Sequence, residues 1–334
     1  MCVPLVSIVT PFHNTADYLS QCIQSVLAQT YTNFEYILVD NCSSDGSHEI
    51  AAEFARRDPR IRLLRHPELL SQVRNYNVAL EQISATSEYC KIVQADDIIF
   101  PDCLRMMVET FQQSGSIGLV SSYYLKGTAV RGSGFPYPMT FISGRDWAKF
   151  YLRTGVFVFG SPTTVMYRSS LIRASREFYD ESLLHEDTEK CMQILKDCDF
   201  GFAHQVLSFL RLGNESISSR VRDFYPENLD WYIITQRYAP VFLEKEEAAA
   251  LMRRTRREYY QLLAHEALRF RPRHFWQYHL DGLKTLGSSL DKGYLLLQLV
   301  REVSGLVLNP GHTIQRLVFW LQRKRKVLKN HEAA

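Results

Sequence analysis

The fold is decided by the stretch Tyr89-Cys90-Lys91-Ile92-Val93-Gln94-Ala95-Asp96-Asp97, a short apolar run that ends in two acids. Two earlier stretches repeat this pattern, VSIVTPFHN at residues 6–14 and YILVDNCSSDG at residues 36–46. Apolar runs of this length are typical of strands that are buried on both faces, as in a parallel sheet. The sequence therefore predicts three buried strands in its first hundred residues.

Polar and acidic side chains stand where each predicted strand ends. In open α/β sheets, ligands bind beyond the carboxyl ends of the strands. We therefore expect one rim of the sheet to collect these side chains: Asn14, Asp40, Asp45, Asp96 and Asp97. Clustered carboxylates at such a rim indicate a divalent cation and a nucleotide.

The wider pattern alternates predicted strands with predicted helices. Strands are expected near residues 5–10, 35–40, 61–65, 89–94, 117–124, 165–167 and 201–211, and helices near residues 16–29, 71–84, 143–153 and 185–197. Residues 126–142 are rich in Gly and Pro and read as a loop. This rhythm predicts an α/β fold with a doubly wound, mostly parallel sheet over residues 1–222. Residues 223–334 read as a separate helical region, with a break expected at Pro240 and another at Pro272.

Composition supports a folded protein and excludes several classes. Hydrophobic residues make up 46% of the chain, enough for a real core. Seven cysteines without a Cys-x-x-Cys pair argue against a disulfide framework and a zinc site. No stretch approaches the roughly 20 apolar residues of a spanning helix, and the start of the chain shows no signal-peptide pattern. We therefore expect a cytoplasmic protein with reduced thiols.

The two regions differ in charge. Residues 1–222 hold 21 Lys+Arg and 24 Asp+Glu, a net charge of −3, and the rest hold 18 and 12, a net charge of +6. A predicted final helix at residues 314–321 carries Trp320 and runs into Arg323-Lys324-Arg325-Lys326. This pattern fits docking on an anionic membrane surface, or else a packing helix with a solvated tail. Nucleic-acid binding is not expected, because no recognition motif accompanies the short cationic run.

In order and spacing, these motifs resemble the family 2 glycosyltransferases, which have the nucleotide-sugar-binding GT-A fold. The resemblance covers about residues 5–105 and is carried by Pro11-Phe12-His13-Asn14, Asp40, Ser43-Ser44-Asp45-Gly46, Arg74-Asn75 and Asp96-Asp97. A weaker match continues to about residue 215, through Phe159-Gly160-Ser161-Pro162 and His185-Glu186-Asp187. Beyond about residue 215, the sequence carries no further motif of this family.

The resemblance implies a nucleotide and metal site. Asp97 would bind Mg²⁺ or Mn²⁺, and Asp96 would contact the metal or the ribose. Asp40 would accept hydrogen bonds from the base, usually uracil, unless it only caps a turn. The residues expected beside the nucleotide are Pro11, Asn14, Asp45 and Arg74. For two of them a structural role is the alternative, a helix cap for Asp45 and a surface ion pair for Arg74.

One position departs from the family pattern. Many members carry Asp-x-Asp-Asp where this chain has Gln94-Ala95-Asp96-Asp97, so the site has one negative charge fewer. Metal affinity and metal choice depend on this substitution. Lys91 interrupts the same apolar strand, and the sequence offers no partner for its charge.

By resemblance, the catalytic base is Asp187. Inverting transfer needs a base to take the proton of the acceptor hydroxyl, and the family carries it in a Glu-Asp pair that opens a helix. Glu186 and Glu189 are rival bases, and a plain helix-starting acid is the structural alternative. Residues 159–164 would lie near the acceptor, and Arg211 with residues 214–216 would lie where the family places a loop that closes over the diphosphate. His204, within a predicted strand, is expected in the core.

The sequence thus predicts an inverting glycosyltransferase of the hexosyltransferase type. It would move a sugar from a nucleotide-diphosphate donor, a UDP-sugar, to a saccharide or lipid-linked saccharide in cell-surface polysaccharide synthesis, at the inner face of the membrane. A sugar nucleotidyltransferase is disfavoured, because residues 11–15 lack the Gly-rich, Lys-bearing loop of that class. A non-catalytic nucleotide-sugar-binding or assembly protein is the other alternative, which Gln94 keeps open.

Overall fold

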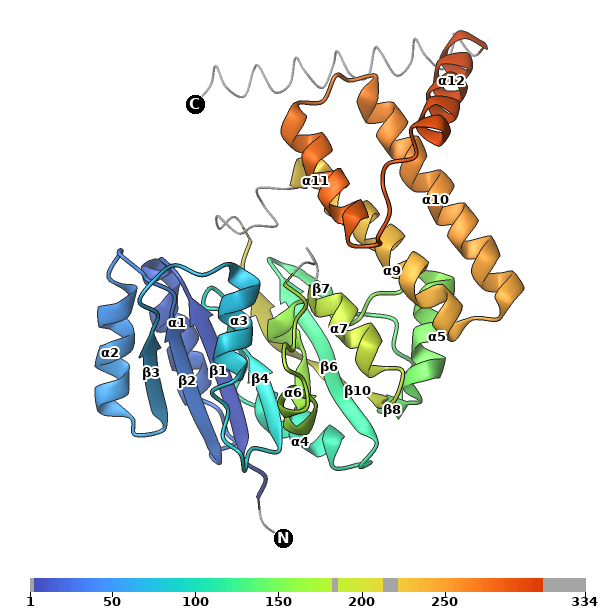
Figure 1. The fold of residues 1–334 in the computed structure, drawn as a ribbon. Helices are drawn as coiled ribbons and strands as arrows, with labels where there is room; N and C mark the ends of the chain where they lie inside the picture. Colours follow the sequence, from blue (N-terminus) through green and yellow to red (C-terminus); the bar gives the residue numbers. More distant parts are fainter. Residues whose placement is uncertain (1–2, 182–185, 213–221, 309–334) are drawn as a thin grey trace. The chain divides into compact units, whose positions relative to one another are not determined.

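The computed structural model describes residues 3–181, 186–212 and 222–308, and it divides into two compact units (Figure 1). The first unit comprises Met1–Asp223 together with Tyr238–Glu244, and the second comprises Phe224–Arg237 together with Lys245–Ala334. The basic segment at residues 314–326 lies outside the described residues. No helix in the described ranges has the length and apolar character that crossing a membrane requires.

A mixed sheet forms the centre of the first unit. Its main path runs β3-β2-β1-β4-β9-β6-β10-β5, with β7 paired to β6 and β8 paired to β10. The strands are β1 (Val6–Phe12), β2 (Phe34–Asp40), β3 (Ile61–Arg65), β4 (Tyr89–Ile92), β5 (Ile98–Ile99), β6 (Ile117–Lys126), β7 (Ala129–Arg131), β8 (Phe141–Ile142), β9 (Met166–Arg168) and β10 (Asp199–Leu210). The first four are parallel, as are β6 and β10, so the predicted mostly parallel sheet is confirmed.

Two parallel blocks of the sheet are joined by β9, which runs antiparallel to both neighbours. It pairs with β4 on one side and with β6 on the other. Residues 126–142, predicted as a loop, contain the short strands β7 and β8, and Phe135 between them is buried. The Gly and Pro residues of that segment correctly indicated turns, but the prediction of a loop missed the two short strands that the turns connect.

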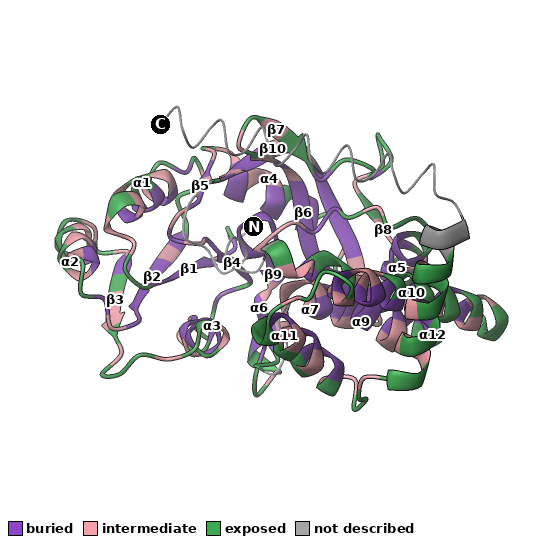
Figure 2. Cartoon of the chain, turned by 90° about the horizontal axis from the view of Figure 1, so that it is seen from above, coloured by how far each residue is buried: buried purple, intermediate pink, exposed green. Residues whose placement is uncertain are grey.

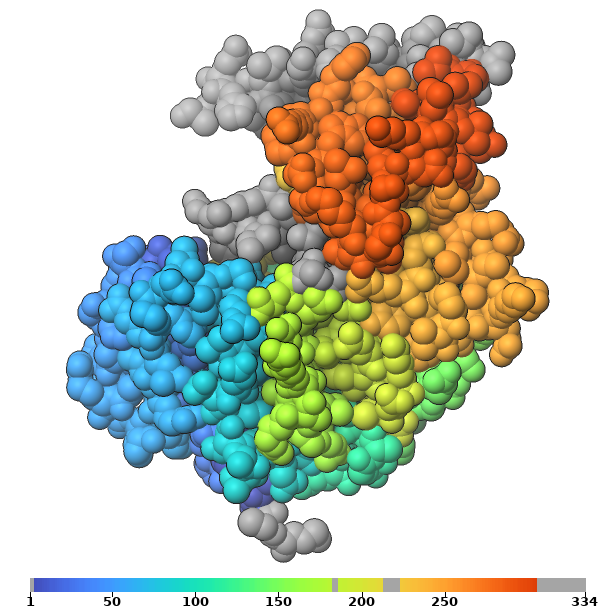
Figure 3. Space-filling model, viewed as in Figure 1, coloured from blue at the N-terminus to red at the C-terminus, as the bar shows by residue number. Residues whose placement is uncertain are grey.

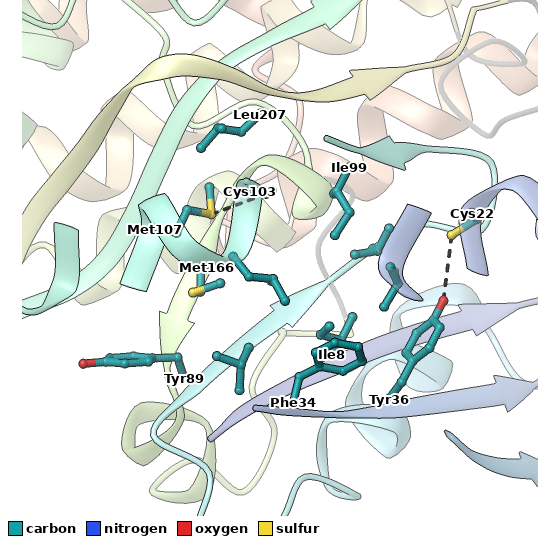
Figure 4. Packing of buried hydrophobic residues seen from close by; sticks show 14 of the residues in the cluster. Ile8, Cys22, Phe34, Tyr36, Tyr89, Ile99, Cys103, Met107, Met166 and Leu207 are labelled. Atoms are coloured by element: carbon teal, nitrogen blue, oxygen red, sulfur yellow. Dashed lines mark hydrogen bonds between the residues drawn. The ribbon is translucent and has the colours of Figure 1, made fainter. Parts of the chain in front are cut away.

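Helices cover both faces of the sheet. On one face, α1 (Ala16–Leu27), α2 (Ser47–Arg57) and α4 (Cys103–Phe111) pack onto the strands in one apolar cluster (Figure 4). Ile8, Cys22, Tyr36 and Met107 lie in that cluster with almost no exposed surface. Burying an aliphatic side chain of this kind stabilises a fold by about 1.5–3 kcal/mol. Figure 2 shows the resulting pattern, with buried strands and helices that are exposed on their outer sides.

The other face of the sheet carries the helices that bring later parts of the chain to the rim. Helix α3 (Gln72–Leu80) packs against β1 and β2. The remaining elements of this unit are α5 (Gly144–Thr154), η1 (Pro162–Thr164), α6 (Ser169–Arg173) and α7 (Glu186–Ile194). Figure 3 shows the residues around α3, in blue, meeting those around α6, in yellow-green. A cavity of about 360 Å³ lies between these segments, and none of the predicted site residues lines it.

The second unit is helical and has its own core. Its helices are α9 (Pro226–Phe242), which also supplies residues to the first unit, α10 (Lys245–Ala267), α11 (Arg273–Lys284) and α12 (Lys292–Leu308). Tyr232 stacks on Tyr259 with ring centroids 4.7 Å apart, and Phe275 is fully buried beside them. Pro272 precedes α11, as predicted. The break predicted at Pro240 is wrong, because α9 continues through it to Phe242.

Candidate active site

The Asp96–Asp97 turn lies between β4 and β5, just past the carboxyl end of a buried strand. The N–H of Asp97 donates to the carbonyl of Gln94 at 2.9 Å and closes the turn. Asp97 is 4% exposed, whereas Asp96 is half-buried. The turn therefore holds one carboxylate inside the protein and one at its surface.

Two hydrogen bonds hold the carboxylate of Asp97. The hydroxyl of Thr163 donates to Oδ2 at 2.5 Å, and the N–H of Arg211 contacts Oδ1 at 3.3 Å. Burial, and after it the neighbouring charge of Asp96, raises the pKa of Asp97 to about 7. A buried carboxylate beside a second acid is a position that a bound cation would stabilise strongly.

The donor set at this turn fits Mg²⁺ or Mn²⁺. Within the described ranges, no group of three or more His, Cys, Asp and Glu side chains is arranged to hold a metal ion. The Asp96–Asp97 pair is nevertheless sufficient, because Mg²⁺ is often bound by one or two carboxylates and completes its shell with phosphates and water. Carboxylate oxygens also suit Mn²⁺.

Gln94 makes polar contacts where many family members carry an acid. Its side-chain Nε2 donates to the hydroxyl of Tyr76 at 3.0 Å, and its backbone N–H donates to Thr163 at 3.0 Å. Gln72, at the start of α3, donates to the same Tyr76 hydroxyl at 3.1 Å. The neutral amide thus connects the end of β4 with α3.

The buried hydroxyl of Tyr76 lies beside Gln94, two residues before Asp96. Burial, followed by the charges of Glu186 and Asp96, raises the pKa of Tyr76 well above its usual range. The charges that act on this hydroxyl thus come from Glu186 at the start of α7 and from Asp96, which are about 90 residues apart in the chain.

Asp187 lies in the first turn of α7, the position expected for its structural alternative, an acid that stabilises the start of a helix. The backbone N–H of Thr188 donates to its Oδ1 at 2.6 Å. After burial, the charge of Asp187 contributes to raising the pKa of Tyr124 and of Tyr179. The preceding His185, part of the predicted motif, lies outside the described residues.

Of the two rival bases, Glu189 is held in the interior. It is 6% exposed, and its Oε1 accepts a hydrogen bond from the hydroxyl of Tyr238 at 3.0 Å. Glu186 is half-buried, as is Asp187. The position of Glu189 favours a structural role, which leaves Asp187 and Glu186 as the acids that an acceptor could reach.

The carboxylate of Asp40 is fully buried and holds three donors. Its Oδ1 accepts from the N–H of Ser43 at 2.9 Å, and its Oδ2 contacts Nδ1 of His48 at 3.0 Å and Nε of Arg65 at 3.2 Å. An ionised carboxylate offers about four acceptor positions, so little capacity remains for a nucleotide base. His48 and Arg65, which the sequence did not single out, are the partly exposed groups at this strand end.

Asn14 and Asp45 connect the loops that follow β1 and β2. Asn14 has a left-handed φ of 49°, and its Oδ1 accepts from the N–H of Ser44 at 2.9 Å. Asp45 accepts from the N–H of Ala16 at 2.9 Å and from the N–H of Ser47 at 3.0 Å, which are the first residues of α1 and α2. Burial raises the pKa of Asp45, but these hydrogen bonds outweigh it and lower the pKa overall.

Asp45 thus performs the helix-starting role that was its alternative interpretation, although the N-cap residue of α2 itself is Gly46. Pro11 pairs with Val39 of β2 and lies beyond Val9, the last residue of β1 that pairs with β4. Its missing N–H therefore breaks no ladder with β4.

Arg74 forms an ion pair on the surface of the first unit. Its Nη1 lies 3.2 Å from Oε1 of Glu181, and the Arg74 side chain is 45% exposed. Exposed pairs of this kind contribute little to stability, so Arg74 can exchange this partner for a phosphate at small cost. Its role beside the nucleotide stays a prediction.

Arg211 lies against the Asp96–Asp97 turn. Its Nε donates to the carbonyl of Asp96 at 3.1 Å, and its Nη2 donates to Gln21 at 2.8 Å. The guanidinium also lies over the ring of Tyr18 at 4.8 Å. The predicted loop residues 214–216 that follow lie outside the described residues.

His204 is part of an aromatic group and does not reach the acids just described. Its Nδ1 contacts the hydroxyl of Tyr123 at 3.1 Å, and its ring packs against Phe202 and Phe135. Its Nε2 contacts the carbonyl of Met139 at 2.6 Å. Both ring nitrogens thus have partners, as expected, but His204 is half-buried and not in the core.

Comparison with solved structures supports the fold. The chain is similar to TarS of Staphylococcus aureus in complex with UDP-GlcNAc, with a TM-score of 0.57 and 18% identity over 77% of this chain and 73% of that one. It is also similar to the mannosyltransferase PcManGT from Pyrobaculum calidifontis, in complex with GDP-Man and Mn²⁺, with a TM-score of 0.53 and 15% identity over 89% and 86%. At these identities the likeness concerns the fold alone.

Sequence comparison identifies the family. A protein of Haemophilus influenzae that is named an uncharacterized glycosyltransferase is 28% identical over 66% of this chain and 84% of its own length. The glycosyltransferase GlyG of Streptococcus pneumoniae is 34% identical over 36% of this chain, and the match spans only 39% of GlyG. Residues 7–175, half of the chain, match the family model of Glycosyl transferase family 2. This chain therefore belongs to glycosyl transferase family 2.

Proposed function

We propose that this protein is an inverting glycosyltransferase that moves a sugar from a UDP-sugar to a saccharide or lipid-linked saccharide. The observation that carries the proposal is the Asp96–Asp97 turn after β4, where Thr163 and Arg211 hold the buried carboxylate of Asp97. Such a pair of acids can bind a donor diphosphate through a cation, and the acid pair that opens α7, Glu186–Asp187, offers the base that an acceptor hydroxyl needs.

Asp96 and Asp97 would hold Mg²⁺ or Mn²⁺, which neutralises the charge of the departing diphosphate. Asp187 would accept the proton of the acceptor hydroxyl. In the same step the oxygen of that hydroxyl forms a bond to the anomeric carbon. The bond from that carbon to the diphosphate oxygen breaks in the same step, with UDP leaving and the configuration inverted. A carboxylate in the first turn of α7 is stabilised in its charged form by the helix dipole, which keeps it ionised but does not raise its basicity.

The choice of donor, acceptor and location rests on different support. TarS was solved with UDP-GlcNAc and PcManGT with GDP-Man and Mn²⁺, so a nucleoside diphosphate donor with a divalent cation is the natural candidate. A Bacillus subtilis relative, TuaG, is named as a putative teichuronic acid biosynthesis glycosyltransferase and is 32% identical over 36% of this chain. This relative supports a role in cell-surface polysaccharide synthesis.

We assign catalysis to residues 1–222 and contact with a membrane surface or partner to residues 223–334. The net charge of +6 of the latter region supports contact with anionic lipid. The protein would then work at the inner, cytoplasmic face of the membrane.

The first test is donor hydrolysis across UDP-, GDP- and TDP-sugars, with and without Mn²⁺. The comparison pairs Asp97→Ala with Glu109→Ala, a surface acid of α4 that is paired with Arg105. Metal-dependent release of UDP from one donor, lost only in Asp97→Ala, supports the proposal. Silence with all donors, together with undetectable UDP binding by calorimetry, overturns it. Retained UDP binding without turnover would instead favour a non-catalytic nucleotide-sugar-binding or assembly protein.

A further inference from the structure

Lys91 is a fully buried cation in the strand that leads to the acidic turn. It lies in β4, opposite Ile8 of β1 and Met166 of β9, and no part of it is exposed. Burial lowers the pKa of Lys91, as expected for a charge that is removed from water. Lysine is almost never buried without a partner, so its contacts should reveal what it stabilises.

The ammonium of Lys91 has two contacts within the described residues. Its Nζ donates to the backbone carbonyl of Thr163 at 2.6 Å and lies 3.6 Å from Sδ of Met107. The thioether is a weak acceptor, so the carbonyl is the dominant partner. A charged donor gives a stronger hydrogen bond than a neutral one, and Thr163 is thereby tied to the middle of β4.

Thr163, which Lys91 holds through its carbonyl, is in turn hydrogen-bonded to the Asp96–Asp97 turn. Its hydroxyl accepts from the N–H of Gln94 at 3.0 Å and donates to Oδ2 of Asp97 at 2.5 Å. The residue is fully buried in η1, so its hydroxyl cannot turn to water. Oδ1 of Asp97 is the oxygen with spare capacity, since its contact in the described part of the chain is the 3.3 Å approach of the Arg211 N–H.

We infer that Lys91 is a positioning residue that acts through Thr163 to fix the carboxylate of Asp97 for a divalent cation. The inference rests on the proposed function, since it assumes that Asp97 is a metal ligand. Groups that orient metal ligands commonly change metal affinity 10- to 100-fold when they are removed. The segment around Thr163 is the one that the family resemblance puts near the acceptor, so the same contact connects the acceptor side with the metal side.

The test measures Mn²⁺ affinity directly, by calorimetry on protein saturated with UDP. Lys91→Met removes the ammonium and keeps the length of the side chain, whereas Thr163→Val removes the hydroxyl and keeps the carbonyl. Two matched controls are Met107→Leu, which removes the weaker contact of Lys91, and Thr163→Ser, which keeps the hydroxyl. UDP affinity is measured in parallel with EDTA, and thermal melts report folding.

We expect Mn²⁺ to bind at least about tenfold more weakly to Lys91→Met and to Thr163→Val, and as in wild type to both controls. Metal-free UDP affinity should stay within about twofold. The double variant that combines Lys91→Met and Thr163→Val should bind Mn²⁺ only slightly more weakly than either single variant, since both substitutions act on one chain of contacts.

A folded Lys91→Met protein with wild-type Mn²⁺ affinity overturns the inference. If Lys91→Met does not fold, Thr163→Val decides, and wild-type Mn²⁺ affinity there overturns it as well. Failure of the wild-type protein to bind Mn²⁺ with UDP would instead overturn the proposed cation site, so the two failures are distinguishable.

Discussion

The side chain of Gln94 donates to the hydroxyl of Tyr76 at 3.0 Å. Where many family members carry a negative charge, this chain thus has a neutral hydrogen bond beside Asp96 and Asp97. An acid at residue 94 would stand next to Asp96 in a partly buried turn, where like charges oppose each other. The amide avoids that repulsion and at the same time ties β4 to α3. The substitution is therefore compatible with a two-carboxylate cation site.

Tyr76→Phe tests this contact. Removing the hydroxyl leaves the half-buried Nε2 of Gln94 without its acceptor, whereas exposed Gln72 can turn to water. The expected loss is about 1 kcal/mol in the free energy of unfolding. Urea denaturation of the variant and of Tyr179→Phe, a neighbouring ring that lies outside this contact, measures it. An equal loss in both variants would contradict a specific role for the Gln94 contact.

Asp187→Asn tests the proposed base. A general base contributes about 10²–10⁴-fold to a rate, so turnover should fall by that factor while folding is kept. Glu189→Gln is the matched control on the same helix, because its amide oxygen can still accept from Tyr238 and activity should persist. Initial rates with the donor that the hydrolysis screen identifies decide the question. Loss of activity in Glu189→Gln with survival in Asp187→Asn would reverse the assignment.

Acid should weaken the second unit through His279. Burial lowers the pKa of this side chain to about 4 from an ordinary value of 6.5, and its Nδ1 contacts the hydroxyl of Tyr259 at 2.9 Å. Between those values the unfolded chain binds the proton more readily than the folded one, so stability falls as the pH drops from 6.5 toward 4. The full loss is of the order of 3 kcal/mol.

Denaturation at pH 7 and at pH 4.5, for wild type and His279→Gln, checks this expectation. The variant lacks the imidazole that titrates in this interval, so it should lose less stability over the same interval. Identical pH dependence in both proteins would show that other groups control acid unfolding.

Gly160→Ala should destabilise the turn that holds Thr163. Gly160 has a φ of +73°, and an added Cβ would meet Oγ1 of Thr164 at 2.3 Å. Gly155 has a similar φ of +71° with nothing within 4 Å of the added atom, so Gly155→Ala isolates the cost of the left-handed backbone, about 1–2 kcal/mol. Thermal melts should place Gly160→Ala clearly below Gly155→Ala, and equal melting temperatures would contradict the steric argument.

The first four strands could be predicted from the sequence because each is a run of buried apolar residues that needs no distant information. Such runs identify themselves through composition, and parallel pairing then puts their ends at one rim. The short strand β9, Met166–Arg168, was also expected near residues 165–167, but its place between β4 and β6 depends on partners far away in the chain. The order of the later strands in the sheet could therefore not be predicted from the sequence pattern.

The side-chain partners at the rim were harder to predict than the rim itself. Asp40 and Asp45 lie at the predicted strand end and turn. Their partners, His48 and Arg65 for Asp40 and Ala16 for Asp45, could not be predicted from the spacing of residues. Lys91 stood out as a charge in an apolar strand, yet its partner Thr163 is 72 residues away. Hydrogen bonds between distant loops follow from the completed packing and not from any local pattern.

The antiparallel strand β9 also determines when the first parallel block is complete. Until residues 166–168 have been synthesised, β4 is paired with β1 alone and its other side is an open sheet edge. An open edge carries unpaired backbone groups that can recruit other chains. In the growing chain, the strand that leads to Asp96 and Asp97 is thus an unprotected edge for some seventy residues of translation, and it is closed by the same segment that delivers Thr163.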